Sequence, residues 1–294
     1  MASNIVLYGT GLFGRDLPQL NQSQLSSIQQ SGFTTVILWT LHVDPDGTLV
    51  YNDTVIVRDG IFANTFNYLQ PLVQQLKAEG STVKNVLFCI GDAGGDFQNI
   101  QTLLATPQGK LTLERNFSAL STALSIDGYD FDDEDLYSAD VDTQLTNILR
   151  ANNKMIITYC PYMSQNVWND ALKEVWGELA GMVGQPVRWW NLQCYSGGAG
   201  NDPLLWAQGL PENVGITDRY GFIVPGYDAS VDSVDRIQQH FLRFAGSGIN
   251  GGFIWGSTSV FDSPNTPADY ANAIINGLAG VAPTNASEET LVTA

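Results

Sequence analysis

Runs of apolar and β-branched residues recur along the chain and alternate with segments whose apolar residues follow helical spacing. Residues 34–43 (TTVILWTLHV) form a run long enough for a buried strand. In residues 64–77 the apolar side chains fall at helical intervals, and Pro71 is expected to kink or delay that helix. We expect strands at residues 5–8, 34–43, 85–91, within 125–135, and at 154–161, 187–195, 220–227 and 252–256. We expect helices near 22–31 and 64–77, in segments up to about 124, and at 139–151, 168–179, 204–208, 231–244 and 268–278.

Eight strands, each followed by a helical segment, indicate an α/β fold. Strict alternation over about 280 residues is typical of a closed (β/α)8 TIM barrel, and a doubly wound parallel sheet of the same strand count is the main alternative. A short β-hairpin of residues 49–51 and 55–58, turning at Asn52 and Asp53, is expected as an insertion after the second strand. No change of composition divides the chain. We therefore expect one barrel domain over residues 1–280, which carries any catalysis, and a flexible tail over 281–294.

The fourth predicted strand carries an unusual concentration of acids. Six of the eleven residues in 125–135 are acidic, and Asp130, Asp132 and Glu134 follow a period of two, so in a strand they point to the same face. Tyr129 and Phe131 point to the other face. Carboxyl groups gathered on one buried face repel each other and lose hydration, so this arrangement indicates a reaction or an ion site. In a barrel these residues lie at the carboxyl end of a strand, where catalytic residues gather.

Two ion-site alternatives can be weighed against that interpretation. An EF-hand loop counted from Asp130 requires glycine at its sixth position and an acid at its twelfth, but Asp135 and Val141 stand there. A divalent-metal site at a barrel mouth stays open as an alternative. It has few further ligands to draw on, because the chain contains only two histidines, His42 and His240. We expect no resident metal and no cofactor.

Composition and charge limit the classes of partner. Hydrophobic residues make up 44% of the chain and charged residues 15%, which permits a large core. Thirty acids against 13 bases give a formal net charge of −17, a surface that repels nucleic acid and anionic membrane and is compatible with neutral sugars. The three cysteines lie in apolar runs and suggest buried free thiols. No apolar run approaches the roughly 18 residues of a membrane span.

The first residues bear on compartment. Residues 1–8 lack the basic segment and long apolar segment of a signal peptide, so a cytoplasmic protein or a mature secreted form is expected, and the compartment stays open. Nothing in the sequence indicates the oligomeric state.

Residues 127–134 (DGYDFDDE) keep every fixed position of D-G-x-D-x-D-x-E, and this motif resembles the signature of glycoside hydrolase family 18. The family contains chitinases, endo-β-N-acetylglucosaminidases and inactive lectins. Three weaker segments resemble the family in the same order along the chain. Residues 85–95 resemble its strand-three S-x-G-G segment, with Cys89 in place of serine and Asp92 in place of the second glycine. Residues 193–195 (QCY) resemble its Q-x-Y, and residues 251–255 resemble its final strand, which ends in tryptophan.

The resemblance implies a set of catalytic roles. Glu134 would protonate the glycosidic oxygen, and the substrate's own 2-acetamido oxygen would attack the anomeric carbon in place of a second carboxylate. Asp132 would accept a hydrogen bond from the acetamido N–H and stabilise the oxazolinium cation, and Asp130 would share a proton with Asp132. Tyr195 would donate its hydroxyl to the acetamido carbonyl.

The resemblance also implies contacts to the sugar. Gln193 would lie beside the acetamido group, and Trp255 would stack under the N-acetylglucosamine ring. Asp127 and Tyr227 are further substrate-binding candidates, although Asp127 also fits a structural role in the loop before the strand. Trp39, Tyr162 and Trp189 lie at or near predicted strand ends, and packing explains them almost equally well.

These roles imply a retaining endoglycosidase that acts on β-1,4-linked N-acetylglucosamine, in the chitobiose core of N-glycans or in chitin. A carbohydrate-binding, lectin-like barrel is the alternative from another class, and the altered strand-three segment (Cys89, Asp92) keeps it open. A metal-dependent hydrolase on an unrelated barrel is a third possibility.

Overall fold

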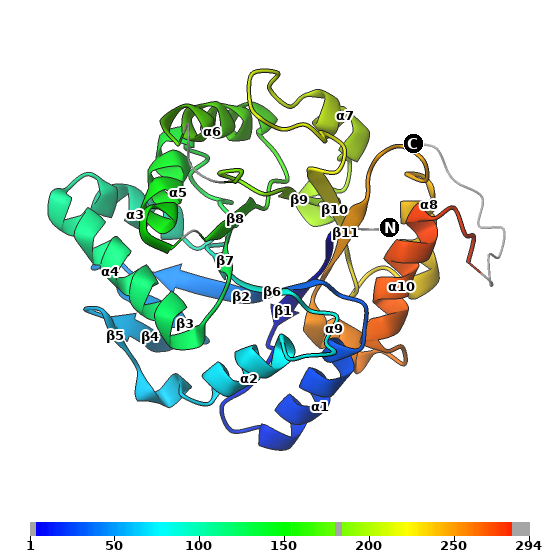
Figure 1. Cartoon of the computed structure of the whole chain (residues 1–294), viewed down its shortest axis with the longest axis horizontal. Helices are drawn as coiled ribbons and strands as arrows, with labels where there is room; N and C mark the ends of the chain where they lie inside the picture. The colour runs from blue at the N-terminus through cyan, green and yellow to red at the C-terminus, as the bar shows by residue number, and fades with distance from the viewer. Residues whose placement is uncertain (1–3, 154, 180–183, 284–294) are drawn as a thin grey trace.

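The structure, a computed structural model, describes residues 4–153, 155–179 and 184–283, and its centre is a closed barrel of parallel strands (Figure 1). The barrel closes because β1 pairs in parallel with both β2 and β11. In order around the barrel the strands are β1 (Asn4–Thr10), β2 (Thr35–Val43), β6 (Asn85–Ile90), β7 (Gly128–Phe131), β8 (Ile156–Tyr159), β9 (Trp190–Gln193), β10 (Ile223–Asp228) and β11 (Gly251–Trp255). The predicted TIM barrel is therefore confirmed, and the doubly wound sheet is excluded.

Helices surround the barrel on its outer side (Figure 1). They are α1 (Pro18–Gln29), α2 (Leu69–Leu76), α3 (Asp96–Leu104), α4 (Pro107–Leu124), α5 (Ala139–Asn153), α6 (Gln165–Glu178), α7 (Pro203–Gln208), α8 (Val234–Leu242), α9 (Ser257–Asp262) and α10 (Pro267–Leu278). Short 3-10 turns at Asn64–Phe66 and Ser196–Gly198 complete the set. None of the helices in the described part of the chain combines the length and apolar character that a membrane crossing needs.

Some helix boundaries differ from the prediction, because a proline or an N-capping residue sets where the helix begins. The helix expected over 64–77 is a 3-10 turn followed by α2, which places Pro71 in its first turn, where a missing backbone N–H costs little. Thr106 caps α4 by accepting a hydrogen bond from the Gly109 N–H, which separates α3 from α4. The short helix α9 was not predicted.

The insertion after the second barrel strand is confirmed as a hairpin of β3 (Leu49–Tyr51) and β4 (Thr54–Arg58), extended by β5 (Ile61–Phe62). β3 pairs antiparallel with the carboxyl end of β2, with His42 opposite Val50. The turn residues Asn52 and Asp53 both have positive φ angles, 49° and 55°, as a type I′ hairpin turn requires. The hairpin therefore projects from the end of the barrel where the strands finish.

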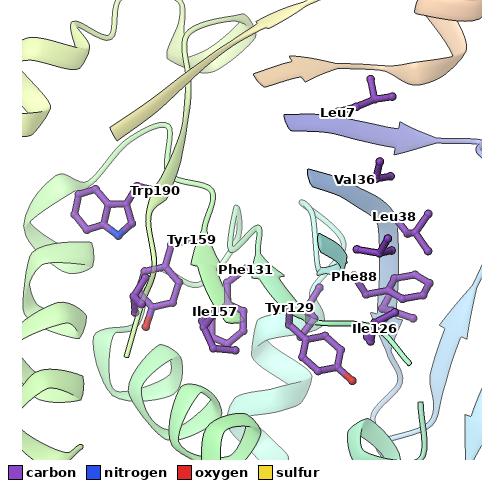
Figure 2. Packing of buried hydrophobic residues seen from close by; sticks show 14 of the residues in the cluster. Leu7, Val36, Leu38, Phe88, Ile126, Tyr129, Phe131, Ile157, Tyr159 and Trp190 are labelled. Atoms are coloured by element: carbon purple, nitrogen blue, oxygen red, sulfur yellow. The ribbon is translucent and has the colours of Figure 1, made fainter. Parts of the chain in front are cut away.

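Alternation along the strands separates two layers of buried side chains. Tyr129 and Phe131 point out of the barrel: the Tyr129 hydroxyl donates to the Phe117 carbonyl oxygen of α4 at 2.8 Å, and Phe131 stacks on Tyr159 at 5.3 Å (Figure 2). Asp130, between them, points into the barrel. The inner layer comprises Val6, Tyr8, Ile37, Leu87, Cys89, Cys160, Trp189, Val224 and Phe253. Glycine at position 226 makes room in it, because a Cβ there would lie 2.0 Å from the Phe253 ring.

The remaining predictions about the chain can be placed on this structure. The three cysteines are buried and free, as predicted. The barrel occupies the described part of the expected domain 1–280. Of the tail predicted over 281–294, residues 284–294 lie outside the described residues.

One buried acid in α5 has a predictable effect on stability. Asp142 is 0% exposed, and neither of its carboxylate oxygens has a hydrogen-bond partner among the described residues. Burial raises its pKa well above the usual range, and the charge of Asp133 adds to that shift. The folded state binds the proton of the Asp142 carboxyl more tightly than the unfolded state does. Protonation of Asp142 therefore stabilises the fold at acidic pH. That stability is lost as the pH rises between the unfolded and folded pKa values.

Asp142→Asn is therefore expected to be more stable than the unmodified protein at pH 8, by about 1–3 kcal/mol, because the amide cannot ionise. At pH 4 the two proteins are expected to unfold at nearly the same denaturant concentration. The measurement is urea unfolding at both pH values. Asp140→Asn, an exposed acid on the same helix, is the matched control and is expected to change little. A gain of equal size at both pH values would contradict this account of Asp142.

Candidate active site

A pocket of about 260 Å³ opens at the carboxyl ends of the barrel strands. Its walls come from β2, β9 and β11 and from the loops that follow β6, β7, β8 and β9. The lining residues are Trp39, Asp92, Asp132, Glu134, Tyr162, Gln193, Tyr195, Ser196, Gly197 and Trp255. The topology therefore gathers five predicted residues into one site from three different parts of the sequence: Asp132, Glu134, Gln193, Tyr195 and Trp255.

Asp130 lies beneath this pocket rather than in its wall. Its carboxylate is 0% exposed and accepts hydrogen bonds from the Tyr8 hydroxyl at 2.7 Å, from the Asn191 amide at 2.9 Å and from the Thr158 hydroxyl. Burial raises the pKa of Asp130, and these three donors partly offset that effect. This fully buried carboxyl accepts three hydrogen bonds and does not line the pocket, and its charge contributes to the raised pKa of Asp132.

Asp132 stands above Asp130 on the same face. It is 3% exposed, and it accepts hydrogen bonds from the Gln193 amide at 3.1 Å and from the Trp39 indole N–H at 3.4 Å. Burial raises its pKa well above the usual range, and the charges of Glu134 and Asp130 raise it further. Burial and these two charges therefore favour a proton on this carboxyl, and a neighbouring positive charge would favour its release.

Gln193 joins the two carboxyl groups that line the pocket. Its amide nitrogen donates to Asp132 Oδ1 and, at 2.9 Å, to Glu134 Oε1. Glu134 is half-buried, so it faces the pocket while one of its oxygens is held. One side chain from β9 thus fixes a proton-donor candidate beside a buried carboxyl that can carry negative charge.

Aromatic side chains also line the pocket. The Tyr195 ring lies nearly parallel to Trp255, with ring centroids 6.1 Å apart and an interplanar angle of 22°. Trp39 meets Trp255 edge to face at 5.0 Å. Burial raises the pKa of Tyr195 well above 10, and nearby negative charges including Asp132 and Glu134 add to this, so its hydroxyl remains a hydrogen-bond donor. Flat apolar faces beside polar groups suit a sugar ring.

Asp127 is not at this site, although it was expected to contact substrate. It precedes β7 and therefore lies at the amino end of the barrel, opposite the pocket. Its carboxylate forms an ion pair with Lys77 at 2.7 Å and accepts the Val86 backbone N–H at 2.8 Å. These contacts join α2, β6 and the start of β7, which is a structural role.

Tyr227 was also expected to contact substrate, but it does not line the pocket. It is 4% exposed and faces the helices, where its ring stacks on His240 of α8 at 4.2 Å, with an interplanar angle of 4°. Its neighbours in β10, Val224 and Gly226, take the inward positions. The direction follows from the two-residue period of a strand.

Other residues at strand ends divide between the pocket and the core. Trp39 and Tyr162 line the pocket, whereas Trp189 is buried inside the barrel, with its indole N–H donating to Asn191. Asp92 also lines the pocket, a place that the sequence signalled only through its departure from the strand-three glycine. Ser196 and Gly197 were missed, since nothing in their local sequence marks a loop that turns toward the site.

The described residues contain one group that could hold a metal ion, formed by His42, Asp92 and Asp96, whose ligand atoms lie within 4.8 Å of one another. Asp96 already accepts the Val43 backbone N–H and contacts His42 Nδ1 at 3.0 Å. The hydrogen bond that His42 makes to the Asp96 carboxylate raises the pKa of His42, which favours an ion pair. The group includes neither Asp132 nor Glu134, but Asp92 belongs both to it and to the lining of the pocket.

Comparison with known proteins identifies solved structures with a similar fold. No family model and no curated protein matches the sequence. Among solved structures, a fungal endo-β-N-acetylglucosaminidase from glycosyl hydrolase family 18 is similar with a TM-score of 0.63 and 20% identity, over 94% of this chain and 98% of that one. The Legionella pneumophila ChiA C-terminal domain is similar with a TM-score of 0.63 and 16% identity, over 96% of this chain and 100% of that one.

A third similar structure is the chitinase-like agglutinin of Robinia pseudoacacia, with a TM-score of 0.61 and 14% identity, over 93% of this chain and 100% of that one. At these identities the likeness establishes the fold, and the chain has the fold of family 18, as its motif predicted. An agglutinin among the neighbours means that the fold alone does not distinguish a hydrolase from a binding protein. That distinction depends on the residues in the pocket.

Proposed function

We propose that this chain, whose barrel has the fold of glycoside hydrolase family 18, is a retaining endoglycosidase that cleaves β-1,4-linked N-acetylglucosamine with help from the substrate's acetamido group. One observation carries the proposal. The Gln193 amide donates to both Glu134 and Asp132 in a pocket that Tyr195 and Trp255 also line. A binding protein has no need to hold two repelling carboxyl groups together, because their proximity costs free energy.

In the first step Glu134 gives its proton to the glycosidic oxygen as the bond to the anomeric carbon breaks. The acetamido carbonyl oxygen attacks that carbon from the opposite face and forms an oxazolinium ion. Asp132 accepts the acetamido N–H, and its negative charge stabilises the cation. The Tyr195 hydroxyl donates to the acetamido oxygen and orients it, while Trp255 supports the apolar face of the ring.

In the second step Glu134, now a carboxylate, takes a proton from water as the water attacks the anomeric carbon. The oxazolinium ring opens, and two inversions at the same carbon give net retention of configuration. Asp130 is a positioning residue in both steps. It sits beneath Asp132 and makes ionisation of that carboxyl depend on the cation that forms above it.

The substrate class follows from this chemistry. Only a sugar with a 2-acetamido group can supply the internal nucleophile, and both chitin and the chitobiose core of N-glycans carry this group. The proposal is compatible with neighbours that include a chitinase-like agglutinin and an endo-β-N-acetylglucosaminidase. A carbohydrate-binding protein without catalysis is the second candidate, favoured by one feature, the carboxylate of Asp92 in the pocket wall where the resemblance expects glycine.

Incubation with a high-mannose glycoprotein and, separately, with chitin oligomers tests the proposal. We expect at least one of the two to be cleaved, with no loss of rate in the presence of a chelator, because the steps above use no metal. Mass spectrometry of released glycans and oligomers is the measurement. Binding of oligosaccharide without cleavage of either substrate would favour the binding protein, and loss of cleavage in chelator would favour a metal-dependent hydrolase.

A further inference from the structure

The side chains of β9 that point into the barrel form a column of hydrogen-bond donors. Trp189, just before β9, and Asn191 and Gln193 within it lie two residues apart, so they share the inner face of the strand. Trp190 and Leu192, between them, pack in the larger apolar cluster outside the barrel. The roles assigned to the pocket use Gln193 and leave Trp189 and Asn191 without one.

Hydrogen-bond chemistry fixes the direction in which the Asn191 amide faces. The Trp189 indole N–H, which can only donate, lies 2.8 Å from Asn191 Oδ1, so the amide oxygen must face the tryptophan. The amide nitrogen then faces β7, where it donates to Asp130 Oδ1 at 2.9 Å. It also lies 3.5 Å from the hydroxyl oxygen of Thr158 on β8, the strand between β7 and β9. Because Asn191 is 0% exposed, solvent does not compete for these contacts.

Each of the two inward acids of β7 therefore receives an amide from β9. Asn191 donates to Asp130, and Gln193 donates to Asp132 at 3.1 Å, because the inward side chains of both strands repeat every two residues. Gln193 contacts the carboxyl groups that line the pocket, whereas Asn191 lies one layer below them. The Asn191 amide can therefore influence the reacting groups only through Asp130.

The Asn191 contact opposes the effect of burial on Asp130, because hydrogen bonds to a carboxylate favour its ionised form. Burial raises the pKa of Asp130, and the donors Thr158, Tyr8 and Asn191 lower it. Burial also raises the pKa values of four acidic groups around Asp130, and the charge of Asp130 is a further cause at each: Tyr8 on β1, Cys89 on β6, Cys160 on β8 and Asp132 on β7. The tyrosine and the two thiols keep their protons at neutral pH, so Asp132 is the one of the four that titrates together with Asp130.

We infer that Asn191 is a positioning residue of the site: its amide, oriented by Trp189, stabilises the ionised Asp130 carboxylate beneath Asp132 and sets the pH below which activity is lost. This inference rests on the proposed function. Once Asp130 is protonated as well as Asp132, neither carboxyl carries the negative charge that stabilises the oxazolinium ion. Without the amide donor Asp130 binds its proton more tightly, so that loss begins at a higher pH.

Asn191→Leu tests the inference, because leucine keeps the size of the side chain and removes the donor. The measurement is kcat/KM from pH 3 to pH 8 on whichever chitin oligomer or glycopeptide the unmodified chain cleaves. We expect the acidic limb of the profile to move to higher pH by about one unit, which is about a tenfold loss of rate on that limb, with a much smaller change at the optimum.

Asn116→Leu is the matched control. It removes another buried amide, one whose hydrogen bonds go to backbone groups of Gly47 and Gly60. We expect this control to leave the pH profile in place. A shift of the acidic limb in Asn116→Leu as large as that in Asn191→Leu would overturn the inference.

Trp189→Phe is the second variant, and it decides the inference if Asn191→Leu does not fold. Phenylalanine keeps an aromatic ring but has no indole N–H, so the Asn191 amide is no longer oriented. We expect the acidic limb to move in the same direction as in Asn191→Leu, by a smaller amount. A limb that stays in place in the folded variants, or a loss of rate that is equal at every pH, would overturn the inference.

Unfolding in urea gives a readout that does not depend on turnover. In the Asn191→Leu protein the folded state has the higher Asp130 pKa, so its stability relative to the unmodified chain falls as the pH rises through the two pKa values. We expect the difference in free energy of unfolding to widen from pH 3 to pH 7, and the difference for Asn116→Leu to stay constant. If the unmodified chain cleaves no substrate, the proposed function fails, and the unfolding comparison still decides whether Asn191 stabilises ionised Asp130. A constant difference for Asn191→Leu would overturn that role.

Discussion

Glu134→Gln is expected to lower kcat/KM for glycan hydrolysis by about 10²–10⁴-fold and to leave glycan binding nearly unchanged. The amide cannot give a proton to the glycosidic oxygen. Its carbonyl oxygen can still accept the Gln193 N–H that Glu134 Oε1 accepts at 2.9 Å, so the pocket keeps its shape. The measurement pairs initial rates with calorimetric binding of the uncut glycan.

Glu212→Gln, which removes an exposed acid that does not line the pocket, is the matched control and is expected to keep the full rate. A Glu134→Gln protein that retains more than a tenth of the rate would remove Glu134 from the role of proton donor. Weak binding accompanied by a lower unfolding temperature would instead indicate that the substitution disturbs the fold.

Asp132→Asn is expected to lower kcat by about 10²–10³-fold with a smaller change in KM. The amide can accept the Gln193 N–H through its remaining oxygen, but it carries no negative charge for the oxazolinium ion. It also places an NH₂ group where Asp132 Oδ2 accepts the Trp39 indole N–H at 3.4 Å. Steady-state kinetics with thermal unfolding separate this effect from a loss of structure.

Asp133→Asn provides the contrast one residue away. Asp133 is 1% exposed, and its carboxylate accepts the backbone N–H groups of Asp135, Leu136 and Tyr137. This variant is expected to lower the unfolding temperature, whereas Asp132→Asn is expected to lower kcat at a nearly unchanged unfolding temperature. Equal kcat in Asp132→Asn and the unmodified chain would contradict the assigned role of Asp132.

The alternating pattern of β7 correctly predicted which of its side chains face the inside of the barrel. A period of two places Asp130 and Asp132 on one face of the barrel wall and Tyr129 and Phe131 on the other, and the structure has them so. Glu134 lies beyond the end of the strand, but the shared contact with Gln193 keeps it beside Asp132. The two-residue period of a strand was therefore enough to predict the direction of these side chains, because β7 ends directly at the pocket.

Asp127 and Tyr227 were predicted to bind substrate, and neither lines the pocket. Register pairs Gly226 with Phe253 and Asp228 with Trp255, so Tyr227 must point outward once Trp255 points inward. Counting positions along β10 from Gly226 gives this direction. Asp127 belongs to the motif in sequence, but it precedes the strand, and the amino end of a barrel strand faces away from the site.

A second pocket, lined in part by Trp39, Asn52 and Asp53, could not be predicted in the same way. It depends on how far the hairpin turn at Asn52 and Asp53 reaches toward Trp39, and that distance depends on tertiary packing rather than on local pattern. The hairpin itself was predictable from its turn residues. The position of the hairpin beside the first pocket depends on the pairing of β3 with the carboxyl end of β2, which the sequence did not show.

The anomeric configuration of the first product shows whether cleavage proceeds with retention through the substrate's acetamido group. Proton NMR during cleavage of a high-mannose glycopeptide or a chitin oligomer shows the new reducing end before mutarotation. For an acetamido-assisted retaining enzyme we expect the β-anomer to appear first. We also expect no cleavage of a substrate in which hydroxyl replaces the 2-acetamido group at the cleaved linkage. Initial release of the α-anomer, or equal cleavage of the substrate without the acetamido group, would contradict it.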